Sequence, residues 1–225
     1  MKKKNSMQMM LASMALMLMA SPAFAQKFKV AKVERTRILI DRKWDAQPDA
    51  EAAKFIAPYQ HKVDSIMGPV VGSVAHDMTH HRPESELSNL LSDILVWGGR
   101  QFNEQPVFSV YNMGGIRADF AKGDINVGDV SEVAPFENKI CFLTLTGEKV
   151  LELFQQIAHR GGEGVSHAVR MVITRDGKLK GVTLNGEPVD PAKSYRIATL
   201  DYLAEGNDQL VAFKSGTDVV APKAK

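Results

Sequence analysis

The chain has 225 residues, with 28 basic and 26 acidic side chains, one cysteine and a formal net charge of +2. One thiol excludes an internal disulfide, so the stability of the fold has to come from packing. Beyond the three N-terminal lysines the charges are interspersed without a basic run, which argues against a nucleic-acid polymer or an anionic membrane surface as the partner.

The first 25 residues have the layout of a secretory signal peptide. Three lysines precede an apolar stretch rich in Met, Leu and Ala, and Ala23-Phe24-Ala25 follows. This pattern predicts cleavage after Ala25 and a periplasmic or secreted protein. An uncleaved anchor helix is the alternative, but the apolar stretch is short for a membrane span and no second one follows to anchor the chain. Cleavage leaves 200 residues with 25 basic and 26 acidic side chains, enough for one core.

Residues 26–68 are predicted to form an N-terminal arm and a helix. The β-branched stretch 28–44 is a strand or an extended arm. A helix is predicted over 48–67, with Pro58 expected to bend or divide it. Its apolar side chains recur at helical intervals: Phe55, Tyr59, Val63 and Ile66.

Residues 69–225 are predicted to form one globular domain together with residues 26–68, because no repeat or low-complexity linker interrupts them. The class is α+β, a mixed α/β sandwich with a mixed sheet. Asp176-Gly177 and Asn185-Gly186 are predicted hairpin turns. The predicted elements are a strand at 68–74, a helix at 83–105 with an apolar stripe (Leu87, Leu90, Leu91, Ile94, Leu95), a strand at 107–112, a strand at 140–145 that buries Cys141, a helix at 146–160, a hairpin at 169–189 and a final strand at 194–200.

The loop after the strand at 107–112 is the first candidate site. It reads Asn112-Met113-Gly114-Gly115-Ile116-Arg117. The two glycines let a backbone approach a ligand closely, and an arginine offers a planar fork of donors. The alternative is a turn with a surface arginine in a local ion pair, and the motif alone does not decide between them.

Several separated motifs together resemble one family, the C-terminal domain of 5′-nucleotidases. They are "ESELSNLLSDIL", "NMGGIRADFAKGDINVGDVSEVAPFENKI", "LTGEKVLELFQQ" and "VTLNGEPVDPAKSYRIATLDYLAEGND", and they span about Pro69 to Phe213. The resemblance implies a domain that binds the nucleoside part of a nucleotide. In that family a separate N-terminal metallophosphoesterase domain holds two metal ions and performs the hydrolysis, so no cofactor and no catalytic residue is expected in this chain.

The resemblance also implies the residues of the site. Asn112 and Arg117 resemble the family's substrate contacts, with Gly114 and Gly115 beside them. Phe136 and Tyr202 resemble the two rings that stack on the base. Asp208 resembles the acid that accepts hydrogen bonds from ribose hydroxyls. Ordinary core packing is the alternative for both rings, although Pro135 and Gly206 beside them make deep burial less favoured.

The sequence departs from the family pattern at several places. His81 stands where an arginine is usual, with Arg82 adjacent, and Ala168 replaces a glycine near the base. Asn207 and Gln209 stand where glycines are common. These departures leave the base preference and the affinity open, and His81, Arg82 and Ala168 are possible further contacts.

Other catalytic equipment is not apparent from the sequence. The Asp-x-His, Gly-Asn-His and Gly-His-x-His segments of two-metal phosphoesterases do not occur. His76 and His80 are four residues apart with Asp77 between them, which suits zinc only on a helix, and nearby Gly72 and Pro83 favour a loop. The remaining histidines are isolated and expected to be exposed or capping: His61, His159 and His167.

Two functions remain in view. The favoured one is the nucleoside-binding half of a split 5′-nucleotidase, which positions nucleoside 5′-phosphates for a separately encoded metallophosphoesterase carrying divalent metals. The alternative is a stand-alone periplasmic nucleoside or nucleotide binding module without a hydrolytic role.

Overall fold

The computed structural model describes residues 29–46 and 48–221, so the predicted signal peptide lies outside the described residues. Two compact units divide the chain, with the boundary between Ala50 and Glu51. In the first unit, residues 29–41 adopt neither helix nor strand, and the short 3-10 helix η1 (Arg42–Ala46) follows. The extended arm is therefore what the structure has, rather than a strand.

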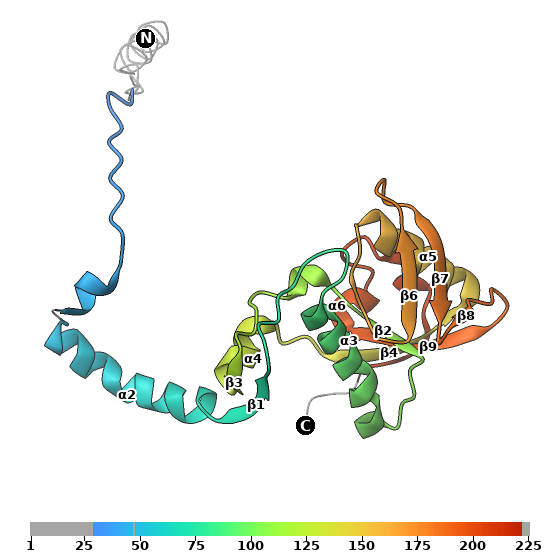
Figure 1. Ribbon diagram of the computed structural model, residues 1–225, viewed down its shortest axis with the longest axis horizontal. Coiled ribbons are helices and arrows are strands. Elements are labelled where there is room, and N and C mark those ends of the chain that lie inside the picture. Colours follow the sequence, from blue (N-terminus) through green and yellow to red (C-terminus); the bar gives the residue numbers. More distant parts are fainter. Residues whose placement is uncertain (1–28, 47, 222–225) are drawn as a thin grey trace, which may run out of the picture. The chain divides into compact units, whose positions relative to one another are not determined.

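Helix α2 (Ala50–Met67) runs without interruption through Pro58, so the helix is not divided there (Figure 1). The side chains of its apolar stripe are present as predicted, but all four remain exposed to solvent. None of the helices in the described part of the chain is both long and apolar enough to cross a membrane.

A five-stranded mixed sheet forms the centre of the second unit, as predicted. Strands β4 and β9 pair antiparallel along their whole length, from Ile140 opposite Leu200 to Thr146 opposite Ser194. β2 pairs with β9 in parallel, whereas β5 and β10 close the two edges antiparallel. The prediction that the strand at 194–200 is the last one is wrong, because β10 follows it. The order across the sheet is β10 (Thr217–Val220), β4 (Ile140–Thr146), β9 (Ser194–Leu200), β2 (Phe108–Tyr111) and β5 (Gly164–Val165).

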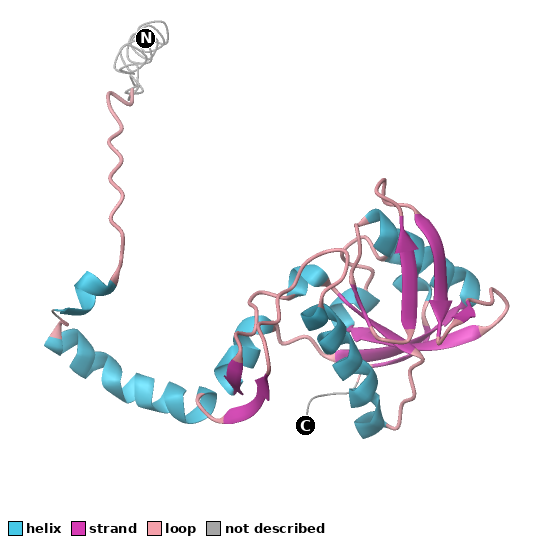
Figure 2. Cartoon of the chain, in the orientation of Figure 1, coloured by secondary structure: helices cyan, strands magenta, loops and turns pink. Residues whose placement is uncertain are grey.

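Two smaller sheets accompany it (Figure 2). The predicted hairpin forms a three-stranded sheet of β6 (Val169–Ile173), β7 (Leu179–Leu184) and β8 (Glu187–Pro188). Asn185 and Gly186 both have positive φ, 51° and 85°, as a two-residue hairpin turn of this type requires. The third sheet pairs β1 (Val70–Val74) with β3 (Gly123–Asn126), a strand that we did not predict.

Side-chain caps begin the three longer helices of the sheet region. Ser85, Asn126 and Thr146 each accept a backbone N–H of the first turn. The short helices have no such side-chain cap. The helices are α3 (Glu86–Gly98), α4 (Val127–Val133), α5 (Gly147–His159) and α6 (Asp201–Ala204), with the 3-10 helices η2 (Gly99–Phe102), η3 (Met113–Gly115) and η4 (Val211–Ser215).

The apolar stripe predicted for α3 is only partly buried. Leu87 and Leu95 are buried, whereas Leu90 and Ile94 remain 36% and 45% exposed. The helix instead turns two fully buried serines toward the sheet: Ser88 and Ser92. A Cβ added to Gly164 of β5 would lie 2.9 Å from Ser92 Oγ, so small side chains are what this close approach permits. The buried face is therefore rotated away from the leucine stripe.

Helix α5 supplies much of the main core. Val150, Leu153, Phe154 and Ile157 are fully buried and pack with residues of the central sheet. Cys141 is buried in β4 as predicted, and burial raises the pKa of its thiol. This core holds the ends of β2 and β9 in place, and the loops that follow those two strands form the candidate site.

Candidate functional site

A hollow of about 220 Å³ lies where the loop after β2 meets the segments after α4 and β9. Six of the seven residues predicted to contact substrate line it, and Arg117 does not. Asn138, two residues after Phe136, was not among the predicted contacts, although it lies in the same family-like motif as Phe136. The lining residues are Asn112, Gly114, Gly115, Phe136, Asn138, Tyr202 and Asp208.

Asn112 lines this hollow, and one of its side-chain atoms is an acceptor without a partner in the described chain. Its side-chain Nδ2 donates to Asp208 Oδ2 at 2.9 Å, which fixes the amide. Its Oδ1 is buried without a hydrogen-bond partner in the described chain. An unsatisfied buried carbonyl is costly, so a donor from a ligand would stabilise it.

The two loop glycines have different reasons to be glycine. A Cβ on Gly115 would lie 2.7 Å from Asn112 Oδ1, so this glycine makes room for the asparagine. A Cβ on Gly114 would meet nothing within 4 Å, so that position is open to a ligand. Only Gly114 therefore fits the expectation that backbone and ligand come close together here.

The two predicted stacking rings are not core residues. Phe136 is 52% exposed and Tyr202 is 39% exposed, although both line the hollow. The Tyr202 hydroxyl donates to Asp208 Oδ1 at 3.4 Å. The negative charge of Asp208, together with partial burial, raises the pKa of Tyr202.

Asp208 occupies a strained turn. Asp208 and Gln209 have φ of 54° and 63°, a region that glycine adopts freely and other residues adopt less readily. The departure from glycine at position 209 therefore carries a conformational cost. Asn207 supports the turn, because its Nδ2 donates to the Tyr202 carbonyl at 2.8 Å.

Arg117 lies at the border of the loop rather than inside the hollow. Its backbone N–H donates to the Val133 carbonyl at 2.9 Å, and its guanidinium reaches the Gly114 carbonyl at 3.5 Å. In the described chain its side chain makes no other hydrogen bond, so most of its donors are open to a ligand. Among the described residues, Arg117 therefore does not form the local ion pair that was the alternative prediction.

Glu163 contacts the predicted loop and was not among the residues predicted from the sequence. Its side chain is fully buried, and its Oε1 accepts from Arg82 Nη2 at 2.8 Å and from Arg160 Nε at 2.6 Å. Its Oε2 accepts the Met113 N–H at 2.6 Å, inside the predicted loop. An acid flanked by glycines directly after a helix was the available signal.

The three possible contacts separate in the structure. Arg82 is bound to Glu163, whereas His81 is exposed and Ala168 is buried in the main core. None of the three lines the hollow.

The two histidines considered for zinc have separate partners. His76 Nε2 lies 2.6 Å from Glu86 Oε2, and His80 Nδ1 lies 2.6 Å from Asp119 Oδ1. Desolvation opposes ionisation of Asp119, but the hydrogen bonds and charge of His80 lower the pKa of that carboxyl overall. Across residues 29–46 and 48–221, no group of three metal-ligating side chains converges.

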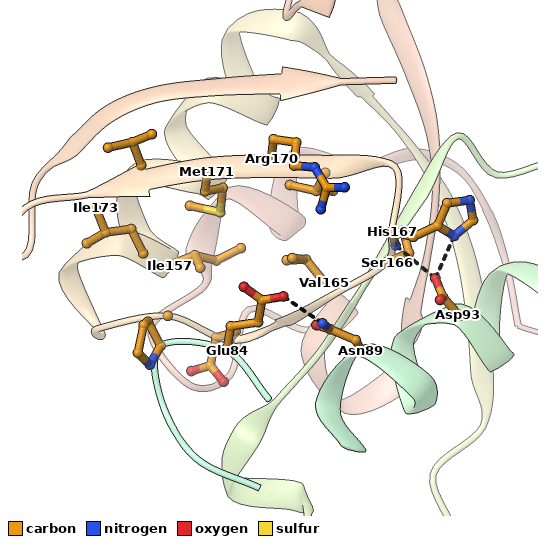
Figure 3. A pocket seen from close by; sticks show the side chains of 15 residues that line it. Glu84, Asn89, Asp93, Ile157, Val165, Ser166, His167, Arg170, Met171 and Ile173 are labelled. Carbon is orange, nitrogen blue, oxygen red and sulfur yellow. Dashed lines mark hydrogen bonds and ion pairs between the residues drawn. The ribbon is translucent and has the colours of Figure 1, made fainter. Parts of the chain in front are cut away.

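A larger groove of about 550 Å³ lies between β6, the start of α3 and the loop at 83–84 (Figure 3). Its floor is apolar (Figure 3), and four of its polar side chains form two pairs. Asn89 Nδ2 donates to Glu84 Oε1 at 2.7 Å, and His167 Nδ1 lies 2.9 Å from Asp93 Oδ1. The smaller hollow is the better candidate site, because six of the seven predicted contacts line it.

The fold is that of an α+β domain, and two exposed rings, an acid and an amide side chain line its hollow. Comparison with known proteins identifies the family. The 5′-nucleotidase C-terminal domain matches residues 70–215, well over half of the chain. The chain therefore belongs to the 5′-nucleotidase C-terminal domain family.

Individual relatives agree. Protein UshA of Escherichia coli (strain K12) is 30% identical over 157 residues, which cover 68% of this chain and 28% of the relative. Protein UshA of Salmonella pullorum is 36% identical with the same coverage. The solved 5′-nucleotidase precursor of Thermus thermophilus superposes with a TM-score of 0.66 and 28% identity, over 79% of this chain and 38% of that one. The chain thus spans well under half the length of each of these proteins.

Proposed function

We propose that this chain binds nucleoside 5′-phosphates in the hollow and acts as the nucleoside-binding half of a 5′-nucleotidase. The observation that carries the proposal is the convergence of two exposed rings, an acid and an unpaired amide oxygen on one hollow. Rings that stay exposed at a concave site offer their faces to a flat ligand, and stacking of this kind tolerates any base.

Each group has a part in the proposed complex. Phe136 and Tyr202 stack on the base, while Asp208 accepts hydrogen bonds from the ribose hydroxyls. Asn112 Oδ1 accepts one further donor from the nucleoside. Arg117, with most of its guanidinium open, offers donors to ribose or phosphate oxygens.

Hydrolysis in this proposal belongs to a metallophosphoesterase encoded separately. The metals reside in that partner, and the open side of the hollow faces it so that the phosphate reaches them.

Helix α2 offers a second surface for an interaction with the partner, since its apolar stripe is exposed. Contiguous exposed apolar side chains are typical of protein interaction sites. The interface is expected to be weak, because substrate entry and product release require the two halves to move.

The same proposal places the protein in the periplasm or outside the cell, following the signal-peptide pattern of residues 1–25. Detection of the chain in a periplasmic or culture-supernatant fraction, with a new N-terminus at Gln26, is the expected result. Retention of the full-length chain in the cytoplasm would contradict export.

An activity assay on nucleoside monophosphates tests the proposal. The purified chain alone, with Mg²⁺, Mn²⁺ or Zn²⁺, is expected to release no phosphate. Addition of an exported metallophosphoesterase from the same organism that lacks a domain of this family is expected to produce turnover. The chain with Phe136→Ala and Tyr202→Ala together is the control and should restore little activity.

The outcomes separate the two functions in view. Metal-dependent hydrolysis by the chain alone would overturn the split arrangement. Tight adenosine binding without any turnover, together with failed co-purification, would favour the stand-alone binding module.

A further inference from the structure

Helix α2 carries an apolar stripe, and in the described chain none of its residues is buried. Phe55 and Tyr59 are 71% and 64% exposed, although their ring centroids lie 5.9 Å apart. The other large apolar side chains of the helix are exposed as well: Ile56, Val63, Ile66 and Met67. A contiguous apolar surface of this kind is typical of a protein interaction site.

The helix needs a packing partner for its own stability. Pro58 lies inside it and has no N–H, so one backbone hydrogen bond of the helix is missing. Helices in proteins gain most of their stability when an apolar face packs against another element, because a single helix in water is only marginally stable. The stripe is therefore expected to be covered in the assembled protein.

The positions of the stripe are symmetric about Tyr59. Phe55 and Val63 lie four residues before and after it. Ala52 and Ile66 lie seven residues before and after it. Two antiparallel copies of the helix, with a two-fold axis beside Tyr59, would place every member of this set opposite another member. A two-fold interface requires such self-complementarity, because one surface meets its own copy.

The sizes of the side chains favour antiparallel over parallel pairing. In the antiparallel pair, Phe55 lies opposite the smaller Val63 of the second copy, and Ala52 lies opposite the larger Ile66. A parallel pair would place Phe55 against Phe55 and Ala52 against Ala52, which crowds one layer of the interface and leaves a gap in another. Opposed helix dipoles also favour the antiparallel arrangement.

We propose that α2 pairs antiparallel with α2 of a second copy of this chain, so that the protein forms a two-fold dimer. The exposed stripe amounts to about 500 Å² per copy, and a pair would bury roughly 1,000 Å², the lower limit for a specific interface. The dimer is therefore weak and exchanges with the monomer. The proposed metallophosphoesterase would use the same stripe, so one α2 binds either that partner or a second copy.

Sedimentation equilibrium of the purified chain, starting at Gln26, tests the dimer. The wild type is expected to shift from monomer to dimer as its concentration rises. Tyr59→Glu is expected to weaken association at least about tenfold, because two carboxylates then face each other at the two-fold axis. Ala57→Glu adds the same charge on the opposite side of the helix, so it is the matched control and should associate like the wild type. Circular dichroism checks that both variants keep their helix content.

Cysteine cross-linking tests the antiparallel arrangement. A mixture of Phe55→Cys and Val63→Cys is expected to give a disulfide-linked dimer, because these positions lie opposite each other. Phe55→Cys alone is expected to give much less, since its two copies are separated by about 12 Å along the pair, whereas a disulfide needs roughly 7 Å or less between Cα atoms. The native Cys141 is buried and does not compete.

The inference is overturned if the wild type stays monomeric, or if Tyr59→Glu associates as well as Ala57→Glu. Phe55→Cys that cross-links by itself as well as in the mixture would show a parallel pair and overturn the antiparallel one. A monomeric wild type that binds vesicles of phosphatidylethanolamine and phosphatidylglycerol would assign the stripe to a membrane surface instead. A chain that dimerises but binds no nucleotide would contradict the proposed function and leave this inference standing.

Discussion

Two pairs of aromatic rings in this domain differ in their burial. Phe108 and Phe154 are fully buried with ring centroids 5.3 Å apart, and they join β2 to α5. Phe136 and Tyr202 lie on the hollow and keep 52% and 39% of their surface exposed. The first pair stabilises the fold through burial, whereas the second contributes less to stability because much of its surface stays in water. Exposure, rather than residue type, therefore separates packing from binding.

The acids show the same contrast. Glu104 accepts a bidentate pair of hydrogen bonds from Arg196 of β9, at 2.7 and 2.6 Å, and the same guanidinium reaches the Asp218 carbonyl. This pair ties strand β9 to its neighbours and does not line the hollow. Glu163 instead accepts hydrogen bonds from Arg82, from Arg160 and from the Met113 N–H in the loop that lines the hollow. Glu104 therefore stabilises the sheet region, whereas Glu163 connects the loop after β2 to two arginines.

The largest expected effect on stability comes from removing one ring of the buried pair. Phe154→Ala should lower the free energy of unfolding by about 3–5 kcal/mol, because it removes a fully buried ring and leaves a cavity. Urea unfolding followed by circular dichroism measures this. The matched control Phe136→Ala should cost less than about 1 kcal/mol, since surface changes away from packed features are small. Equal losses from both variants would show that Phe136 is a packing residue.

The second prediction concerns the exposed pair. Phe136→Ala and Tyr202→Ala should each weaken adenosine binding by about 1–3 kcal/mol, with little preference among bases, because stacking uses the ring face alone. Titration calorimetry with adenosine and uridine measures it, with circular dichroism to show that each variant is folded. Unchanged affinity in both folded variants would remove the rings from the site.

The third prediction tests Glu104 as a structural acid. Glu104→Gln should lower the free energy of unfolding by about 1–2 kcal/mol at pH 7, because two charge-assisted hydrogen bonds are weakened. The hydrogen bonds from Arg196 lower the pKa of Glu104 from its usual 4.5, although desolvation opposes them. A lowered pKa stabilises the fold above the unfolded value and loses that contribution as the pH falls through the folded value.

The difference between wild type and Glu104→Gln should therefore shrink as the pH is lowered below 4.5. Urea titrations at several pH values follow the difference, and adenosine affinity at pH 7 serves as the control and should not change. A stability difference that is independent of pH would contradict the ion pair as its cause.

The smallest expected effect lies within the hollow. The negative charge of Asp208 raises the pKa of Tyr202, so Asp208→Asn should lower that pKa toward its usual value of 10.0. NMR titration of ring-labelled tyrosine resolves this residue from the other three. If the pKa of Tyr202 is the same in wild type and in Asp208→Asn, the ring and the acid do not face each other in solution.

Local features account for what could be predicted. The helices α2, α3 and α5 and the turn at Asn185-Gly186 follow from periodicity and backbone preference, and the structure confirms them. The short elements β3 and β10 were missed because each has only four residues, and neither shows a readable pattern: all of β10 is exposed, and Ile125 alone is buried in β3. Helix α4 was also missed, although Asn126 and Asp129 form a capping box that signals its start.

The sequence by itself determined the family and the loop at 112–117, because ordered motifs and paired glycines are local properties of the chain. Only the tertiary structure decided which face of α3 is buried, that Asn138 joins the hollow, and that Glu163 gathers Arg82 and Arg160. Asn112 and Asp208 are 96 residues apart in the chain, yet they share a hydrogen bond. A buried charge or an unpaired acceptor is defined by its surroundings, and those arise only when distant segments pack together.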